Sequence, residues 1–170
     1  DWALGKFFEK AKKQPWFDDT IFIITADHVI AHYQSGDFLE KFRIPFFVYA
    51  PKIFQPRKEK IVASQLDILP TIVNLLGLKG SYATIGEDIL GKEKDPFAMV
   101  IHGSEVGAIT TSGYLRHSLV QRLEAKNILD SHSSTHFETL EKKLLSLNQL
   151  TFELLQKNKC KFIVMPCNTA

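Results

Sequence analysis

Apolar residues at helical spacing open the chain. Between Asp1 and Lys13 they recur every three or four positions, which predicts an amphipathic helix that ends at Gln14-Pro15. A continuous apolar run follows from Thr20 to Ala26, and a second one spans Arg43 to Pro51. Runs of this length and composition are typical of strands covered on both faces. The pattern therefore predicts one helix followed by two buried strands.

A second helix is predicted beyond a charged loop, within the stretch SQLDILPTIVNLLGLKG. Asp67 stands where it can cap this helix, Pro70 is tolerated in the first turn, and Gly77 suits its end.

In the C-terminal half the residue pattern predicts short strands and one long helix. Ser112-Gly113 favours a hairpin, and Thr135-His136-Phe137-Glu138 forms a capping box that opens the helix. The strand candidates are Phe97–His102, Val106–Thr110, Tyr114–Leu123 and Lys161–Met165. Strands joined by long crossovers that contain helices predict an α/β layered fold, with a mostly parallel core sheet and an antiparallel portion toward the C-terminus.

Composition narrows the function classes. A net charge of +2, with lysines spread along the chain, gives no reason to expect a nucleic-acid partner. Cys160 and Cys167 are too few for a disulfide framework, and no Cys/His zinc spacing occurs. No apolar stretch is long enough to span a bilayer. Because Asp1 enters the helical pattern at once, without Met or a leader, we expect the chain to be part of a longer protein.

Asp27 and His28 directly follow the first apolar run. Ligands of open α/β sheets bind outside the carboxyl ends of the strands, and a backbone turn there lets adjacent side chains face one site. A carboxylate oxygen and a neutral imidazole nitrogen suit a divalent metal such as Zn²⁺ or Mn²⁺. Two ligands do not complete a site. The alternative interpretation is that Asp27 caps a turn and His28 packs beside it.

Three segments, PWFDDTIFIITADH, RIPFFVYAPK and SQLDILPTIVNLLG, occur in this order. Together they resemble the C-terminal half of the sulfatase-like branch of the alkaline phosphatase superfamily, and within it the lipoteichoic acid synthase and phosphoglycerol transferase group. The resemblance covers Asp1 to Gly91 well and is looser to about Lys159. It implies an alkaline-phosphatase-like layered sheet as a partial domain. Residues 1–159 would be the C-terminal part of a sulfatase-like catalytic domain, and residues 160–170 a tail whose assignment stays open.

The resemblance implies metal-dependent chemistry. By motif, Asp27 and His28 would be metal ligands, with Mn²⁺ favoured and Zn²⁺, Mg²⁺ or Ca²⁺ as alternatives. True sulfatases typically carry Asn in place of the His. His28 therefore favours transfer or hydrolysis of a phosphate ester, such as a phosphoglycerol or phosphoethanolamine group, over hydrolysis of a sulfate ester.

The same resemblance places the nucleophile, a Thr, Ser or modified Cys, upstream of this chain, so no catalytic residue is assigned. We expect the isolated chain to bind metal weakly and to turn over nothing. A sulfatase and a non-catalytic sulfatase-like binding module are the alternatives. The resembled group also implies an anionic lipid or glycan substrate, a membrane anchor elsewhere in the protein, and a location outside the cytoplasmic membrane. The pattern predicts no oligomeric state.

His32 would share a helical face with His28, four residues earlier, and could touch a substrate phosphate. A loop position is the simpler interpretation, since short spacings match by chance. The remaining histidines are interpreted as turn, strand or solvated residues: His102, His117, His132 and His136.

The tail supports a minor alternative. The segment KFIVMPCNTA resembles the strand and cysteine of aspartate and glutamate racemases, in which Cys167 would be a thiolate base.

Overall fold

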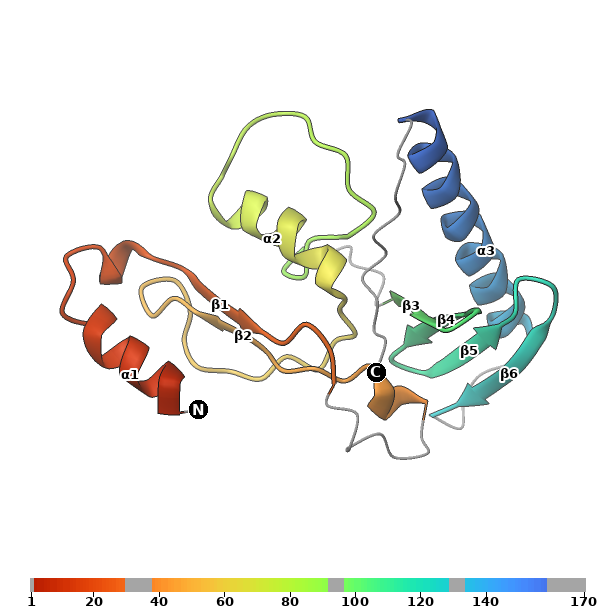
Figure 1. The fold of residues 1–170 in the computed structure, drawn as a ribbon, viewed down its shortest axis with the longest axis horizontal. Coiled ribbons are helices and arrows are strands. Elements are labelled where there is room, and N and C mark those ends of the chain that lie inside the picture. Colours follow the sequence, from red (N-terminus) through yellow and green to blue (C-terminus); the bar gives the residue numbers. More distant parts are fainter. Residues whose placement is uncertain (1, 30–37, 92–96, 129–133, 159–170) are drawn as a thin grey trace.

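The computed structural model describes residues 2–29, 38–91, 97–128 and 134–158, which form two neighbouring parts (Figure 1). The N-terminal part contains helices α1 (Trp2–Ala11) and α2 (Ile68–Leu75), strands β1 (Phe22–Thr25) and β2 (Phe46–Tyr49), and the short 3-10 turns η1 (Phe17–Asp19), η3 (Leu39–Lys41) and η4 (Gln65–Asp67). The C-terminal part contains strands β3 (Phe97–His102), β4 (Glu105–Thr110), β5 (Gly113–His117) and β6 (Arg122–Asn127), and helix α3 (Ser134–Lys157).

β1 and β2 form a two-stranded antiparallel sheet, with Phe22 opposite Tyr49 and Thr25 opposite Phe46. The α/β class is as predicted, but the mostly parallel pairing is not seen among the described strands. A continuous apolar run reports burial on both faces and carries no information on strand direction. The described part of the β1–β2 connection contains the three-residue turn η3 and no helix of crossover length.

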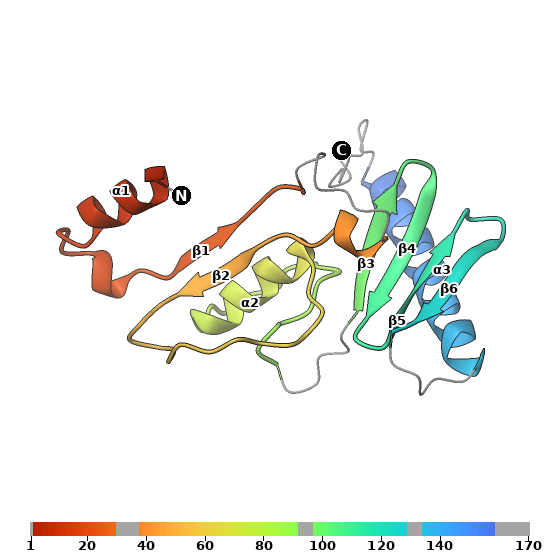
Figure 2. The same ribbon diagram turned by 90° about the horizontal axis from the view of Figure 1, so that it is seen from below.

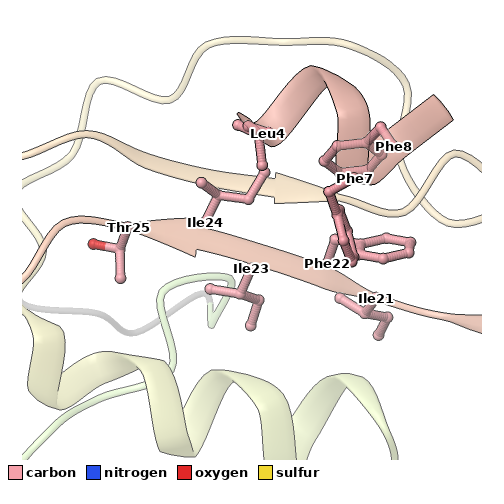
Figure 3. A pocket seen from close by; sticks show the side chains of 8 residues that line it. All are labelled: Leu4, Phe7, Phe8, Ile21, Phe22, Ile23, Ile24 and Thr25. Carbon is pink, nitrogen blue, oxygen red and sulfur yellow. The ribbon is translucent and has the colours of Figure 1, made fainter. Parts of the chain in front are cut away.

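Helices cover both faces of β1, which explains its unbroken apolar sequence. On one face the Phe8 ring of α1 lies 5.1 Å from the Phe22 ring and 5.5 Å from the Tyr49 ring, centroid to centroid. Figure 3 shows Ile24 on this same side, at an apolar hollow beside α1, whereas Ile23 points to the side on which α2 lies. Successive side chains of β1 therefore face α1 and α2 in turn.

Both ends of the α2 region are capped. The Ser64 hydroxyl accepts from the Leu66 N–H (3.0 Å), and the Asp67 carboxylate accepts from the Ser64 N–H (2.8 Å). Asp67 occupies the N-cap position of α2 as predicted but makes no side-chain cap bond to that helix, and its carboxylate instead completes a capping box at η4 whose N-cap is Ser64. At the other end Gly77 has φ +60°, and the Leu78 N–H donates to the Val73 carbonyl (3.0 Å), a Schellman ending.

The four C-terminal strands form an antiparallel meander in the order β3-β4-β5-β6, and α3 packs on one face (Figure 2). The core between this face and α3 consists of Val106, Ala108, Leu115, Phe137, Leu140 and Leu144. The opposite face is covered by Phe38, with Leu39 and Phe42, which pack against Val100 and Tyr114.

No helix in the described part of the chain is both long enough and apolar enough to cross a membrane.

The predicted strand Tyr114–Leu123 is wrong, because a turn divides it into β5 and β6. In this turn the Ser118 N–H donates to the Gln121 carbonyl (3.0 Å), and Leu119 has φ +71°. The sequence SLVQ contains neither Gly nor Pro, so the apolar pattern runs through the turn without a visible break. The predicted strand Lys161–Met165 and the side chain of Thr135 lie outside the described residues.

Glu141 of α3 joins the helix to the sheet. One carboxylate oxygen lies 3.2 Å from His117 Nε2, and the other lies 2.5 Å from an Arg122 guanidinium nitrogen. The hydrogen bond from Arg122 lowers the pKa of Glu141 below its ordinary value of 4.5. A carboxyl with a depressed folded-state pKa stabilises the fold above its unfolded-state pKa, and this contribution disappears as the pH falls through the folded-state value.

We therefore expect the Glu141→Gln variant to lose less stability on acidification than the unmodified chain. The free energy of unfolding, measured with urea at about pH 7 and at steps below about pH 4.5, should fall less steeply in the variant. Glu138→Gln, which changes an exposed carboxyl on the same helix, serves as the control. If the free energy of unfolding falls equally with pH in Glu141→Gln and in the unmodified chain, the stabilising role of the Glu141 carboxylate is contradicted.

Candidate metal centre

Asp27 and His28 lie on the turn that directly follows β1. The His28 Nε2 atom is 3.4 Å from Asp27 Oδ2, so the two side chains converge. Both remain accessible, with 86% of the Asp27 side chain and 44% of the His28 side chain exposed. A carboxylate oxygen and an imidazole nitrogen are thus presented together at the surface.

Hydrogen bonds orient the imidazole. His28 Nδ1 lies 2.9 Å from the Val29 carbonyl oxygen, and because a carbonyl only accepts, this nitrogen carries the proton and donates. In the neutral ring Nε2 is then the nitrogen that can accept or ligate, and it lies on the side of the Asp27 carboxylate. Metal-binding histidines generally make such a bond through their other ring nitrogen. Asp27 Oδ1 accepts from the His28 N–H (2.9 Å), which satisfies the turn-capping interpretation with one oxygen and leaves Oδ2 for a ligand.

The pair suits a divalent cation in donor type, since oxygen and imidazole nitrogen are accepted by Mn²⁺ and Zn²⁺. Residues 2–29, 38–91, 97–128 and 134–158 contain no group of three or more His, Cys, Asp or Glu side chains that could hold a metal ion. The described residues therefore offer two donors of an incomplete centre. The assignment of Asp27 and His28 as metal ligands stays a prediction.

Gln65 is a residue that sequence reasoning missed. Its side-chain amide nitrogen donates to the carbonyl oxygens of Ala26 (2.8 Å) and Asp27 (3.2 Å), across 39 and 38 positions of sequence. The sequence pattern placed Gln65 at a helix start, and no local signal reveals a contact made across such a distance. It ties η4 to the turn that carries the metal-ligand candidates.

The other candidates are placed as follows. His32, His132 and the tail with Cys160 and Cys167 lie outside the described residues. The His102 ring packs edge-on against Phe42, with 6.3 Å between centroids. The buried His117 accepts from the Leu119 N–H through Nδ1 (2.8 Å), in accord with its structural interpretation.

His136 differs from its predicted solvated state. Its side chain is half-buried, and its Nε2 atom lies 3.4 Å from the Ser112 hydroxyl. The capping-box pattern located the start of α3 but gave no information on the strand hairpin that this first turn contacts.

Comparison with known proteins supports the resemblance. Residues 1–78 match the family model described as Sulfatase. The lipoteichoic acid synthase-like YvgJ of Bacillus subtilis (strain 168) is 28% identical over 123 residues, covering 61% of this chain and 20% of YvgJ. An endo-4-O-sulfatase of Bacteroides thetaiotaomicron is 26% identical over 144 residues, covering 81% of this chain and 27% of that enzyme. The chain thus spans between a fifth and little more than a quarter of these curated relatives.

A crystal structure of a protein in the alkaline phosphatase superfamily from Vibrio parahaemolyticus matches with a TM-score of 0.70 and 27% identity, over 87% of this chain and 39% of that one. The fold is therefore that of the alkaline phosphatase superfamily, as part of a domain. Within this superfamily the sequence is similar to members of the sulfatase-like branch, with a lipoteichoic acid synthase-like protein and a sulfatase among its relatives.

Proposed function

We propose that this chain supplies the Asp27–His28 portion of a divalent metal centre, in an enzyme that transfers or hydrolyses a phosphate ester. The observation that carries the proposal is the convergence of His28 Nε2 and Asp27 Oδ2, 3.4 Å apart on an accessible turn. The similarity to YvgJ supports the choice of phosphate chemistry. The proposal includes a nucleophile that lies outside this chain. We therefore expect the isolated chain not to turn over a phosphate ester.

Mn²⁺ is the favoured cation, with Zn²⁺, Mg²⁺ and Ca²⁺ as alternatives. When bound, such a cation acts as a Lewis acid that neutralises charge on a phosphoryl group and favours ionisation of a nucleophile. Asp27 contributes negative charge through Oδ2, and His28 contributes its Nε2 lone pair. The Val29 carbonyl holds the ring proton on Nδ1 and so keeps the imidazole in the ligating tautomer.

We also propose an anionic lipid or glycan of the cell envelope as the substrate, and no nucleic-acid partner. The full-length protein would be membrane-anchored and would act outside the cytoplasmic membrane. The similarity to two Bacillus subtilis proteins, lipoteichoic acid synthase-like YvgJ and lipoteichoic acid synthase 2, supports this substrate class.

Hydrolysis of sulfate esters is the second candidate. The endo-4-O-sulfatase similarity extends over 81% of this chain, against 61% for YvgJ. Assays of the full-length protein on bis(p-nitrophenyl) phosphate and p-nitrophenyl sulfate separate the two chemistries. Lack of turnover on both, with metal binding retained, would favour a non-catalytic binding module.

The metal role is tested on the chain itself by titration with Mn²⁺, followed through paramagnetic broadening of backbone amide signals. We expect the signals of residues 26–29 to broaden at the lowest Mn²⁺ concentrations, because the ion binds beside them. Asp27→Ala and His28→Ala should each remove this selective broadening. Asp18→Asn removes the charge of an exposed carboxylate on η1 and should leave it unchanged.

Two results would oppose the metal role. One is broadening at residues 26–29 that is no stronger than at Asp18 and Asp19. The other is an Asp18→Asn effect as large as that of Asp27→Ala, which would indicate diffuse attraction of the cation to acidic side chains.

A further inference from the structure

We propose that Gln65 is a positioning residue that fixes the backbone on both sides of Asp27 and so holds the candidate ligands in a cation-ready arrangement. The inference rests on the proposed metal role of Asp27 and His28. It concerns a side chain that lies outside this pair and belongs to a different element, η4.

Both N–H groups of the Gln65 amide are engaged by the turn. A side-chain amide nitrogen carries two hydrogens, and the two partners, the Ala26 and Asp27 carbonyl oxygens, are both pure acceptors. The orientation of the amide group is fixed by this chemistry, since its oxygen could not face either carbonyl favourably.

These two carbonyls define the conformation of Asp27. Each peptide group is planar, so the Ala26 carbonyl sets the plane that precedes the Asp27 Cα atom and the Asp27 carbonyl sets the plane that follows it. Holding both planes fixes φ and ψ of Asp27. The direction in which the Asp27 side chain leaves the backbone is then fixed, and so are the positions of the His28 N and Cα atoms.

The other bonds of this turn are local. Among the residues that the structure describes, the side chains of Asp27 and His28 make hydrogen bonds to each other and to Val29. Within the part of the chain that the structure describes, the hydrogen bonds from a distant element to the 26–29 backbone are those from Gln65. Since Asp27 and His28 are also exposed, packing contributes little to their orientation.

Gln65 is itself held firmly. It is the first residue of η4, and the Ser64–Asp67 capping box closes this turn. The Asp67 side chain is buried, and its second oxygen accepts from the Glu87 N–H (2.8 Å), which joins η4 to the loop after α2. The two hydrogen bonds from Gln65 therefore connect the exposed turn to a buried and hydrogen-bonded part of the fold.

The test uses Gln65→Met, which keeps the length of the side chain and removes its donors, with Gln149→Met on α3 as the matched control. Gln149 is exposed, and among the described residues its side chain bonds to Glu153, four positions along the same helix. In the metal-free chain we expect the ¹⁵N order parameters of residues 26–28 to fall from about 0.85 to below about 0.6 in Gln65→Met alone. The Mn²⁺ concentration for half-maximal broadening of residues 26–29 should rise roughly tenfold.

A rescue variant separates positioning from general stability. Gln65→Lys again offers N–H donors at a comparable reach and should restore the order parameters of residues 26–28. If Gln65→Met fails to fold, Gln65→Asn, whose amide is one methylene too short, replaces it. Unchanged order parameters in a folded Gln65→Met or Gln65→Asn variant would overturn the proposal, as would an unchanged Mn²⁺ midpoint.

The two hypotheses fail differently. If the unmodified chain shows no selective Mn²⁺ broadening, the metal role is wrong, and the order parameters still decide whether Gln65 fixes the turn. If the unmodified chain binds Mn²⁺ selectively and Gln65→Met binds it equally well, the metal role stands and the positioning role of Gln65 is wrong.

Discussion

Replacing Leu144 by Ala should lower the free energy of unfolding by about 3 kcal/mol, within the range of roughly 2–5 kcal/mol for large-to-small changes in protein cores. Leu144 is fully buried, with 0% of its surface exposed, and lies between α3 and the sheet beside Leu115 and Leu140. The change removes buried apolar surface and leaves a cavity, because α3 can move only partly toward the sheet to close it. Urea unfolding followed by circular dichroism measures the loss.

Leu150→Ala is the matched control for this prediction. Leu150 lies on the same helix but is 46% exposed, so its truncation should change stability by less than about 0.5 kcal/mol. Equal losses for the two variants would show that the core of the C-terminal part does not lie between α3 and the sheet.

Gly86→Ala should lower the stability of the N-terminal part by about 3 kcal/mol, at the upper end of the usual range for inserting an extra group into a packed site. A Cβ atom at Gly86 would lie 2.0 Å from the Leu66 carbonyl oxygen and 2.3 Å from its carbonyl carbon. These are backbone atoms of η4 and cannot rotate away, so either the loop or η4 must shift. The hydrogen bonds from the Glu87 N–H to Asp67 and from the Ile89 N–H to Thr71 would be strained or lost.

Gly5→Ala provides the comparison for Gly86→Ala. Gly5 lies within α1, a Cβ atom there would meet nothing within 4 Å, and the helix should gain up to about 1 kcal/mol. Both variants are measured by thermal and urea unfolding. A Gly86→Ala variant as stable as Gly5→Ala would mean that the loop and η4 are not in contact.

The helices and most strands could be predicted because their signals are local. The apolar spacing of α1, the Gly77 ending of α2 and the long apolar stripe of α3 are each contained in one segment. Strand direction depends on how the intervening chain returns, which the apolar run of β1 does not encode. The turn between β5 and β6 was missed because Leu119 and Val120 continue the apolar pattern while lying exposed.

The candidate site was predictable only in part, for a related reason. Asp27 and His28 are adjacent in sequence, so their joint position at a strand end follows from local pattern. Gln65 reaches the same turn from 38 positions away, and only the tertiary fold brings it there. The sequence placed Asp67 at the N-cap position of α2, but its actual bonds, to the Ser64 N–H in the η4 capping box and to the Glu87 N–H, depend on the folded η4 and loop.

The meander order of β3 to β6 has a kinetic consequence. Each of these strands pairs with its neighbour in sequence through a short turn, so the contacts are of low contact order and form quickly. The β1–β2 pair and the bonds from Gln65 must instead close loops of about twenty to forty residues, at a larger entropic cost. We therefore expect the C-terminal sheet to assemble first and Phe38 to pack onto its already formed surface. The side chains of Asp27 and His28, which follow β1, would then reach their final arrangement late in folding.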